Sequence, residues 1–232
     1  MITDISTPAL LLSFLPAAIV IIILLPVKSL SKTALYATAR MLVQLIIVGY
    51  LLVYIFDTDS WLVVAGILML MLIAAAWIAI RTLETRDTSA FLQALFSIAV
   101  GSISTLGLIT QCVVEIDPWF SPRYVVPLAG MIFAASMNAI SLAAERFEAE
   151  TSRGEDHLDA KQLALQASLI PVINSLFAVG IVTLPGMMTG QILSGVSPIV
   201  AAKYQIVVMS MLFGATGISA AIYLALQPKK PA

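Results

Sequence analysis

Long apolar stretches separated by short polar segments dominate the pattern of the chain. Seven such runs, each 20 to 25 residues long, are Pro8–Val27, Ala34–Phe56, Trp61–Ile80, Ala90–Val114, Tyr124–Ala144, Gln162–Leu184 and Tyr204–Leu226. A bilayer core needs about 20 residues of helix, and barrel strands would alternate apolar and polar residues over about 10 positions. The pattern therefore predicts an all-α integral membrane protein, one polytopic domain over residues 1–232 with seven transmembrane helices.

The composition supports this interpretation and excludes other classes. Hydrophobic residues make up 60% of the chain and charged residues 11%, against about 45–50% and 25% in soluble proteins. Too few charges are present to cover a water-soluble fold. The net charge of −1 leaves no basic surface for nucleic acid. A single cysteine, Cys112, and a single histidine, His157, cannot form a His/Cys metal cage, and which groups would hold a metal is unknown.

The distribution of lysine and arginine predicts the orientation in the membrane. Nine of these residues fall in the loops on one side, and only Arg123 and Lys203 fall on the other. Cytoplasmic loops carry the excess of positive charge. We therefore expect an N-terminus outside, a cytoplasmic C-terminus, and a multi-pass protein of the cell inner (plasma) membrane.

One cytoplasmic segment differs from the others in its charge. Glu145–Lys161 carries nine charges in 17 residues and is predicted to be a loop. Such a segment is either a solvated connector or a docking surface for a cytoplasmic partner. In the second interpretation, Arg146 and Arg153 are the candidate docking residues.

Motifs for catalysis are missing from the sequence. No G-x-x-x-x-G-K-[ST] phosphate loop, H-E-x-x-H or G-x-S-x-G occurs, and these motifs mark nucleotide, zinc and serine chemistry. No acidic residue lies well inside a predicted span, where proton-coupled carriers usually place one. The chain is therefore expected to be a transport subunit without enzymatic activity or cofactor, and any energy is expected to come from another subunit.

Polar residues inside the apolar runs are candidates for a substrate pathway. Arg40 and Gln44 are four residues apart and would share a helix face, although Arg40 could instead extend to the cytoplasmic interface. Asn138 lies in the fifth run and Asn174 in the sixth. Pro171, shortly before Asn174, removes a helix hydrogen bond, so the polar groups near it could equally satisfy the freed carbonyl.

The segment Leu184–Gly190 predicts a break after the sixth helix. Pro185, Gly186 and Gly190 cannot all lie in an uninterrupted helix, and we expect the two glycines to adopt positive φ. Interrupted helices often mark permeation sites, but a simple outer loop would give the same pattern. Methionines cluster in this half of the chain, including Met131, Met187 and Met188, and could bind soft metals or fill gaps in packing.

Five segments of the chain resemble the FetB-type permease family, the membrane subunits of ABC transporters linked to iron export, with plant relatives linked to aluminium tolerance. The segments that carry the resemblance are Arg40–Tyr50, Pro127–Met131, Leu169–Ser175, Val179–Gly190 and Lys203–Val207. The resemblance implies a permease that works as a homodimer with a separate ATP-binding cassette subunit, which would hydrolyse ATP. The residues singled out as its candidate substrate pathway are Arg40, Gln44, Met131, Asn138, Asn174, Met187, Met188 and Gln205.

The chain also departs from the family pattern. Residues 134 and 135 are both alanine where family members usually have Gly-Asn. The loop before the sixth helix lacks the usual Gly-Ala-Thr-Pro segment, which is a candidate coupling helix for the ATPase. A second hypothesis therefore stays open, in which the chain is uncoupled from ATP and acts as a passive channel, a scaffold or a regulator.

Overall fold

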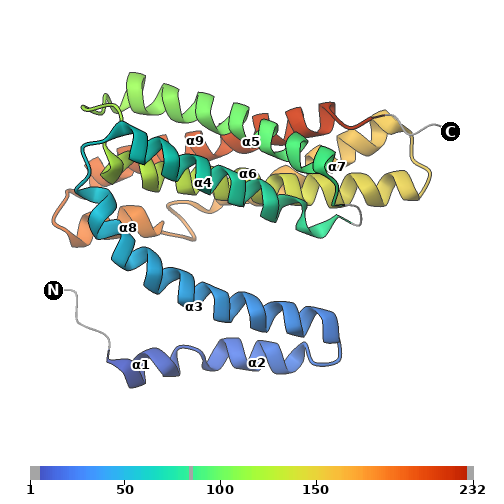
Figure 1. Ribbon diagram of the computed structural model, residues 1–232, viewed down its shortest axis with the longest axis horizontal. Helices are drawn as coiled ribbons and strands as arrows, with labels where there is room; N and C mark the ends of the chain where they lie inside the picture. The colour runs from blue at the N-terminus through green and yellow to red at the C-terminus, as the bar shows by residue number, and fades with distance from the viewer. Residues whose placement is uncertain (1–5, 84–85, 229–232) are drawn as a thin grey trace. The chain divides into compact units, whose positions relative to one another are not determined.

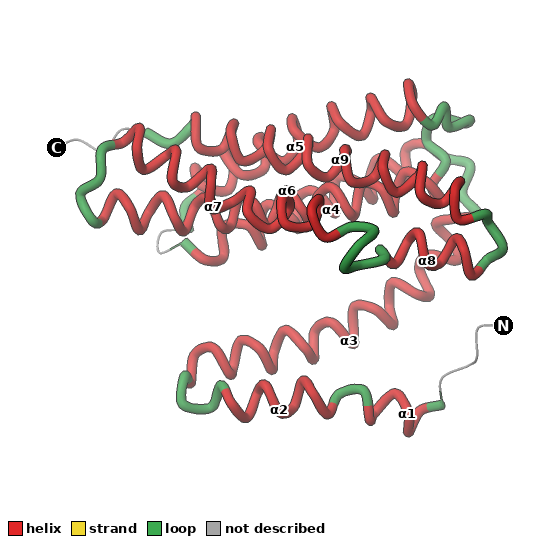
Figure 2. The backbone as a smooth tube through the Cα atoms, turned by 180° about the vertical axis from the view of Figure 1, so that it is seen from behind, coloured by secondary structure: helices red, strands yellow, loops and turns green. Residues whose placement is uncertain are grey.

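The computed structural model describes residues 6–83 and 86–228, which form two compact units. The first unit ends at Asp57 and contains α1 (Thr7–Leu12), α2 (Leu15–Ile23) and α3 (Lys28–Phe56). Within this unit α2 lies beside α3 (Figures 1 and 2). The second unit begins at Thr58.

The second unit is a bundle of helices. They are α4 (Trp61–Ala79), the 3-10 turn η1 (Ile80–Thr82), α5 (Thr88–Leu108), the π-helical turn η2 (Ile109–Val113), α6 (Pro122–Ser152), α7 (His157–Ala178), α8 (Gly186–Leu193) and α9 (Pro198–Ala225). The helix α6 packs against α4, α5, α7 and α9, and α9 packs against α5, α6, α7 and α8. These two helices therefore form the centre of the bundle. The described residues contain no β-strand, only an isolated bridge between Val179 and Thr183.

Small residues and hydroxyl groups join the helices of the bundle. Many of the most buried residues are alanines, among them Ala76, Ala129 and Ala215. The Ser102 and Ser136 hydroxyls lie 3.2 Å apart between α5 and α6, and Ser141 Oγ donates to the Ala79 carbonyl oxygen at 2.7 Å. In lipid, close approach of small residues and hydrogen bonds between helices replace the hydrophobic driving force.

Aromatic pairs lie at the two ends of α4. Trp61 at its start pairs with Trp119 at 6.5 Å between ring centroids, and Trp77 near its end pairs with Phe91 at 6.2 Å. The two tryptophans are 16 positions apart, which corresponds to about 24 Å along a helix. This spacing fits aromatic rings at the two interfaces of a bilayer.

Among the residues that the structure describes, five helices are long and apolar enough to cross a membrane. The all-helical class is thus confirmed, whereas the count of seven spans stays a prediction. The five segments are Lys28–Phe56, Trp61–Thr82, Thr88–Val113, Pro122–Ser152 and Pro198–Ala225. The predicted run Pro8–Val27 is not one continuous helix, because it is divided into α1 and α2 at residues 13 and 14. Pro16 has no N–H to continue the hydrogen-bond ladder, and Ser13 Oγ bonds the Leu10 carbonyl at 2.7 Å.

The charged segment Glu145–Lys161, predicted as a cytoplasmic loop between two spans, is mostly helical, and its place in the cytoplasm stays a prediction. The helix α6 continues to Ser152 and α7 begins at His157. The connection between them contains Gly154 with a φ of 91°, and the Asp156 carboxylate accepts from the Leu158 N–H at 3.1 Å. Alternating charges at helical spacing extend the apolar helices beyond the predicted spans, because oppositely charged side chains three or four residues apart support a helix.

Candidate functional site

The chain leaves its helical path between α7 and α8, close to the predicted break. The helix α7 ends at Ala178, whose carbonyl accepts from the N–H groups of Val182 and Thr183 at 2.8 Å and 3.1 Å. The Gly180 N–H donates to the Thr183 carbonyl at 2.9 Å. This tight turn then leads through Pro185 into α8.

The residues that form the break differ from the predicted ones. Gly186 and Gly190 both lie in α8, neither has positive φ, and an added Cβ would meet nothing within 4 Å at either position. Gly180 and Gly195 have φ of 82° and 94°, so these glycines make the turns before and after α8. Pro171 lies inside α7, which continues through it, and Ser175 Oγ bonds the Pro171 carbonyl at 2.9 Å.

Replacing Gly180 by alanine is expected to destabilise the turn by about 1 to 2 kcal/mol, since L-residues pay that cost in the left-handed region. Gly186→Ala is the matched control, and we expect it to be neutral. The free energy of unfolding of each purified variant in detergent is the measurement. Equal stability of the two variants would contradict the role given to Gly180.

A half-open cavity of about 440 Å³ lies in the second unit, between α6, α7, the turn before α8, α8 itself and α9. Four of the predicted pathway residues line it, namely Met131, Asn138, Met187 and Gln205. Pro171, Pro185 and Gly186 line it as well. The structure thus brings together residues from four helices that are up to about 75 positions apart in the sequence, at the point where the helical path is broken. Permeation sites in membrane proteins are often built at such breaks.

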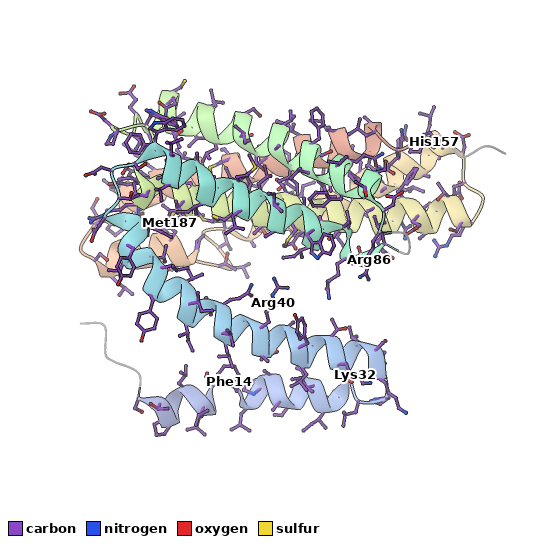
Figure 3. All side chains as sticks on the ribbon, viewed as in Figure 1. Phe14, Lys32, Arg40, Arg86, His157 and Met187 are labelled. Atoms are coloured by element: carbon purple, nitrogen blue, oxygen red, sulfur yellow. The ribbon has the colours of Figure 1, made fainter. Side chains whose placement is uncertain are left out.

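The other predicted pathway residues lie elsewhere. Asn174 and Met188 are on α7 and α8 but do not line the cavity. Arg40 and Gln44 are on α3 in the first unit, and Figure 3 labels Arg40 there and Met187 in the second unit. With its amide oxygen turned toward Arg40, Gln44 accepts from Nε at 3.2 Å and from Nη2 at 3.3 Å. The two residues therefore share a helix face as expected, but their part in a pathway stays a prediction.

One face of α9 forms a wall of the cavity. Its lining residues are Gln205, Val208, Met209, Leu212 and Thr216, and their spacing of three and four places them on one side of a helix. Gln205 is 6% exposed and Thr216 is 3% exposed. Gln205 Oε1 and Thr216 Oγ1 are buried without a hydrogen-bond partner. The sequence did not lead to a prediction for Thr216, although its position three helical turns after Gln205 places both residues on the same helix face.

The cavity has a neutral lining. Its polar or soft residues are Met131, Asn138, Ser168, Ser175, Thr183, Met187, Gln205, Met209 and Thr216, and the remaining lining residues are apolar or small. No Asp, Glu, Lys, Arg or His is among the lining residues. In the part of the chain that the structure describes, no group of three or more His, Cys, Asp or Glu side chains could hold a metal ion. The chemistry offered is therefore that of amide, hydroxyl and thioether groups.

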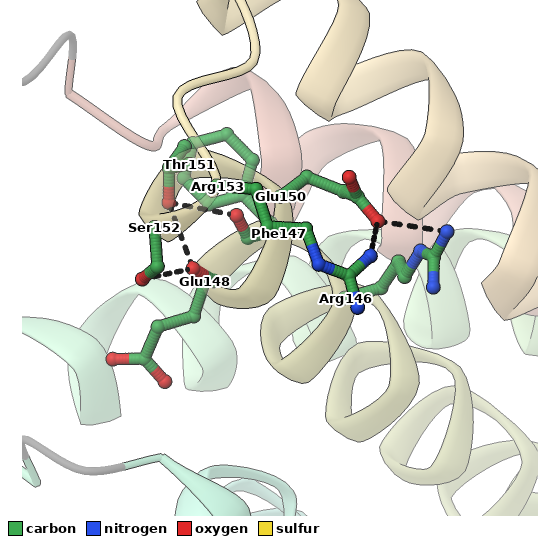
Figure 4. A network of polar contacts seen from close by, with 7 residues as sticks. All are labelled: Arg146, Phe147, Glu148, Glu150, Thr151, Ser152 and Arg153. Atoms are coloured by element: carbon green, nitrogen blue, oxygen red, sulfur yellow. Dashed lines mark hydrogen bonds and ion pairs between the residues drawn. The ribbon is translucent and has the colours of Figure 1, made fainter.

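The two candidate docking arginines bind a glutamate of their own chain. Arg146 Nη2 and Arg153 Nη1 both contact Glu150 Oε1, at 2.7 Å and 2.8 Å (Figure 4). The Glu150 side chain is 5% exposed, whereas those of Arg146 and Arg153 are 39% and 64% exposed. The arginines thus stabilise the end of α6, and their role in docking stays a prediction.

Comparison with known proteins places these features in context. Residues 7–230 match the model of a family described as an uncharacterised protein family, UPF0014. A membrane protein of the family from Synechocystis, slr1647, is 35% identical over 79% of this chain and 77% of its own length. The "probable iron export permease protein FetB" of Escherichia coli is 34% identical over 84% and 79%. The Arabidopsis protein ALUMINUM SENSITIVE 3 is 30% identical over 88% and 81%. No solved structure matches the chain.

Proposed function

The chain belongs to the UPF0014 family of membrane proteins, and from this premise we propose that it is the permease subunit of an ABC transporter that exports metal, with iron as the first candidate. Its membrane character rests on five long apolar helices and on relatives named as membrane proteins. The proposed cargo comes from the name of the Escherichia coli relative, a probable iron export permease.

The observation that carries the proposal is the cavity beside the broken helix. Its lining combines the side chains of Gln205 and Thr216 with the thioethers of Met131, Met187 and Met209. The lining is mainly apolar with a few amide and hydroxyl groups, and polar groups in membrane spans often mark a substrate pathway. The cavity thus supplies the place where a cargo would be held.

A separate ATP-binding cassette subunit would supply the energy in this proposal. The sequence contains no phosphate-binding loop, so ATP hydrolysis would belong to the partner. Two copies of the permease would assemble in the cell inner membrane with two such subunits. The end of α6 and the start of α7, which carry the charged segment, form the proposed cytoplasmic docking region.

The proposed orientation can be tested separately. The nine-to-two distribution of lysine and arginine favours seven spans with the N-terminus outside and the C-terminus in the cytoplasm. A reporter that is active only in the cytoplasm, fused after Pro231, should therefore be active, and the same reporter before residue 1 should be silent. The reverse pattern would contradict the orientation.

Reconstitution tests the function itself. The chain and a candidate ATP-binding cassette protein would be placed together in vesicles loaded with Fe²⁺ or with iron complexes. Efflux is expected to require ATP and both proteins, and to stop when the partner's ATPase is inactivated. Absence of iron movement under all of these conditions would contradict the proposal.

A second candidate function is a chain uncoupled from ATP, acting as a passive channel or a scaffold. The specific observation in its favour is the engagement of Arg146 and Arg153 by Glu150, which occupies the charges proposed for docking. In the same vesicles, iron movement without ATP or partner would identify the channel. A chain that binds the partner without moving iron would be the scaffold.

A further inference from the structure

Three methionines from three different helices line the half-open cavity. They are Met131 on α6, Met187 on α8 and Met209 on α9. A methionine that only serves packing fills the gap beside it, whereas these three side chains border about 440 Å³ that they leave open. Leucine would line the same wall equally well, so the feature that methionine adds here is the thioether sulfur.

The positions of the three methionines along their helices place them near one level of the bundle. The helices α6 and α9 pack against each other and run in the same direction (Figure 1). Met131 comes nine positions after the start of α6 at Pro122, and Met209 comes eleven positions after the start of α9 at Pro198. These offsets correspond to about 14 Å and 17 Å along a helix. Met187 is the second residue of α8, which packs against α9, so the three side chains reach one cavity from three helices.

The other groups of the lining offer little to a hard cation. The lining contains no carboxylate, imidazole or thiol, which are the ligands that divalent iron and zinc use in proteins. Gln205 Oε1 and Thr216 Oγ1 are buried in the protein and cannot contact an ion in the cavity. A hydrated divalent ion would fit the half-open space but would meet no charged group to hold it. The thioethers are therefore the strongest metal ligands that the cavity offers.

Neutral thioethers match one class of metal ion. Soft sulfur ligands favour Cu⁺ over the harder divalent ions, and Ag⁺ shares this preference. The cost of desolvation rises with the square of the charge, so a monovalent ion loses less than a divalent one on entering an uncharged site. Met209 is 9% exposed and Met187 is 36% exposed, so the methionines extend from the buried wall toward the open side of the cavity, from which an ion would enter.

We propose that Met131, Met187 and Met209 form a binding site for a soft monovalent metal ion, which in a cell is Cu⁺. This inference rests on the proposed metal export and specifies the class of its cargo, with a soft ion in place of iron at this site. The ligands are the three thioether sulfurs, each of which binds through a lone pair, so the metal keeps its oxidation state. The uncharged lining gives hard divalent ions no ligand with which to compete.

Binding of Ag⁺ and Cu⁺ to the purified chain in nanodiscs tests the site without any transport step. Cys112 is exposed, and its thiol would bind both ions, so every measurement uses the Cys112→Ser chain. Ag⁺ needs no reductant, whereas Cu⁺ is kept reduced by ascorbate under anoxic conditions and is buffered by bicinchoninate. We expect a single tightly bound ion per chain, and Fe²⁺ and Zn²⁺ should bind at least about tenfold more weakly.

Matched methionine variants separate metal binding from packing. Met131→Leu, Met187→Leu and Met209→Leu nearly conserve volume but remove a sulfur. Each should weaken Ag⁺ binding at least about tenfold, since loss of even an outer partner of a metal ligand costs about 10-fold to 100-fold, and the three together should abolish it. The control chain carries the same change at one methionine of each of these helices that does not line the cavity, and it should bind Ag⁺ like the parent chain. These control positions are Met137 on α6, Met188 on α8 and Met211 on α9.

X-ray absorption at the copper edge adds a measurement that packing alone would not change. With Cys112 replaced, sulfur bound to Cu⁺ can come only from methionine, because the chain has one cysteine. The sulfur signal should therefore be present in the parent and control chains and absent from the variant that lacks all three cavity methionines.

Three results would overturn the inference. They are no binding of Ag⁺ or Cu⁺ by the Cys112→Ser chain, equal loss of binding in the cavity and control variants, or binding of Fe²⁺ as tight as that of Ag⁺. Iron efflux from vesicles by a chain that binds neither soft ion would defeat this inference alone. Tight binding of Cu⁺ by the cavity methionines, without efflux of Cu⁺ or iron in the presence of ATP and partner, would instead defeat the proposed transport.

Discussion

Replacing Gly101 by alanine is expected to destabilise the second unit by about 2 to 3 kcal/mol. A Cβ at Gly101 would contact the Ser219 hydroxyl, and it would lie 2.8 Å from the Ser219 backbone nitrogen and 3.1 Å from the Ala215 carbonyl oxygen. The backbone of α9 cannot yield as a flexible side chain would, so α5 and α9 must separate. Overfilling a packed interface costs about 1 to 3 kcal/mol, and occasionally more.

The control for this substitution lies on the same helix. Gly107→Ala adds the same methyl group, but nothing lies within 4 Å of its Cβ, so this variant should be as stable as the wild type or more stable, by up to about 1 kcal/mol. Ser219→Ala combined with Gly101→Ala should recover only part of the loss, since the backbone nitrogen remains in place. The free energy of unfolding in detergent decides the comparison. A stable Gly101→Ala variant would show that α5 and α9 do not pack as closely as described.

Removing Arg146 and Arg153 together is expected to cost on the order of 3 kcal/mol, the lower end for a buried charge stripped of its partners. Both guanidinium groups contact the same oxygen of Glu150, whose side chain is 5% exposed. Either arginine alone can still neutralise Glu150. Each single alanine variant should therefore lose much less than half of the stability that the double variant loses, so the two single losses should not sum to the double loss.

A rescue variant separates this internal role from docking. Glu150→Gln removes the buried charge, so adding it to the double alanine variant should restore most of the lost stability. If a cytoplasmic partner also depends on the arginines, the rescued triple variant would be stable but would no longer co-purify with the ATP-binding subunit. Additive losses in the two single variants would contradict the shared ion pair. Reversing both arginines to glutamate would not distinguish the two roles, because it places two new negative charges beside Glu150.

The helical parts of the fold could be predicted from local pattern, and their ends could not. The run Trp61–Ile80 matches α4 with η1 almost residue for residue. The hydropathy of the first run predicts one continuous helix, but Pro16 and Ser13 interrupt the helix without lowering the hydropathy. The charged segment shows the opposite case. Its low hydropathy suggests that the helix has ended, but the spacing of Arg146, Glu150 and Arg153 supports a continued helix. Hydropathy measures how well a segment suits lipid, but hydrogen bonds and ion pairs decide where its helix ends.

The sequence predicted some residues of the candidate site and not others. Met131, Asn138, Met187 and Gln205 were chosen from motifs and line one cavity. Asn174 and Met188 belong to the same motifs but do not line it, since neighbouring residues on a helix point about 100° apart. Gly186 and Gly190 were chosen for a flexibility that Gly180 and Gly195 provide instead. A glycine in the sequence does not reveal its φ, which depends on the turn that the flanking helices impose.

By itself the sequence determined that this protein is helical, apolar and suited to a membrane, because helix length and lipid solubility depend only on residues close together in the chain. It also determined the family, through motifs that extend over most of its length. Only the tertiary structure decided that the two arginines neutralise Glu150, that Gly101 meets Ser219, and that Gln205 and Thr216 share an uncharged cavity. These are contacts between side chains and backbone atoms brought together by helix packing, which has no signature in local hydropathy.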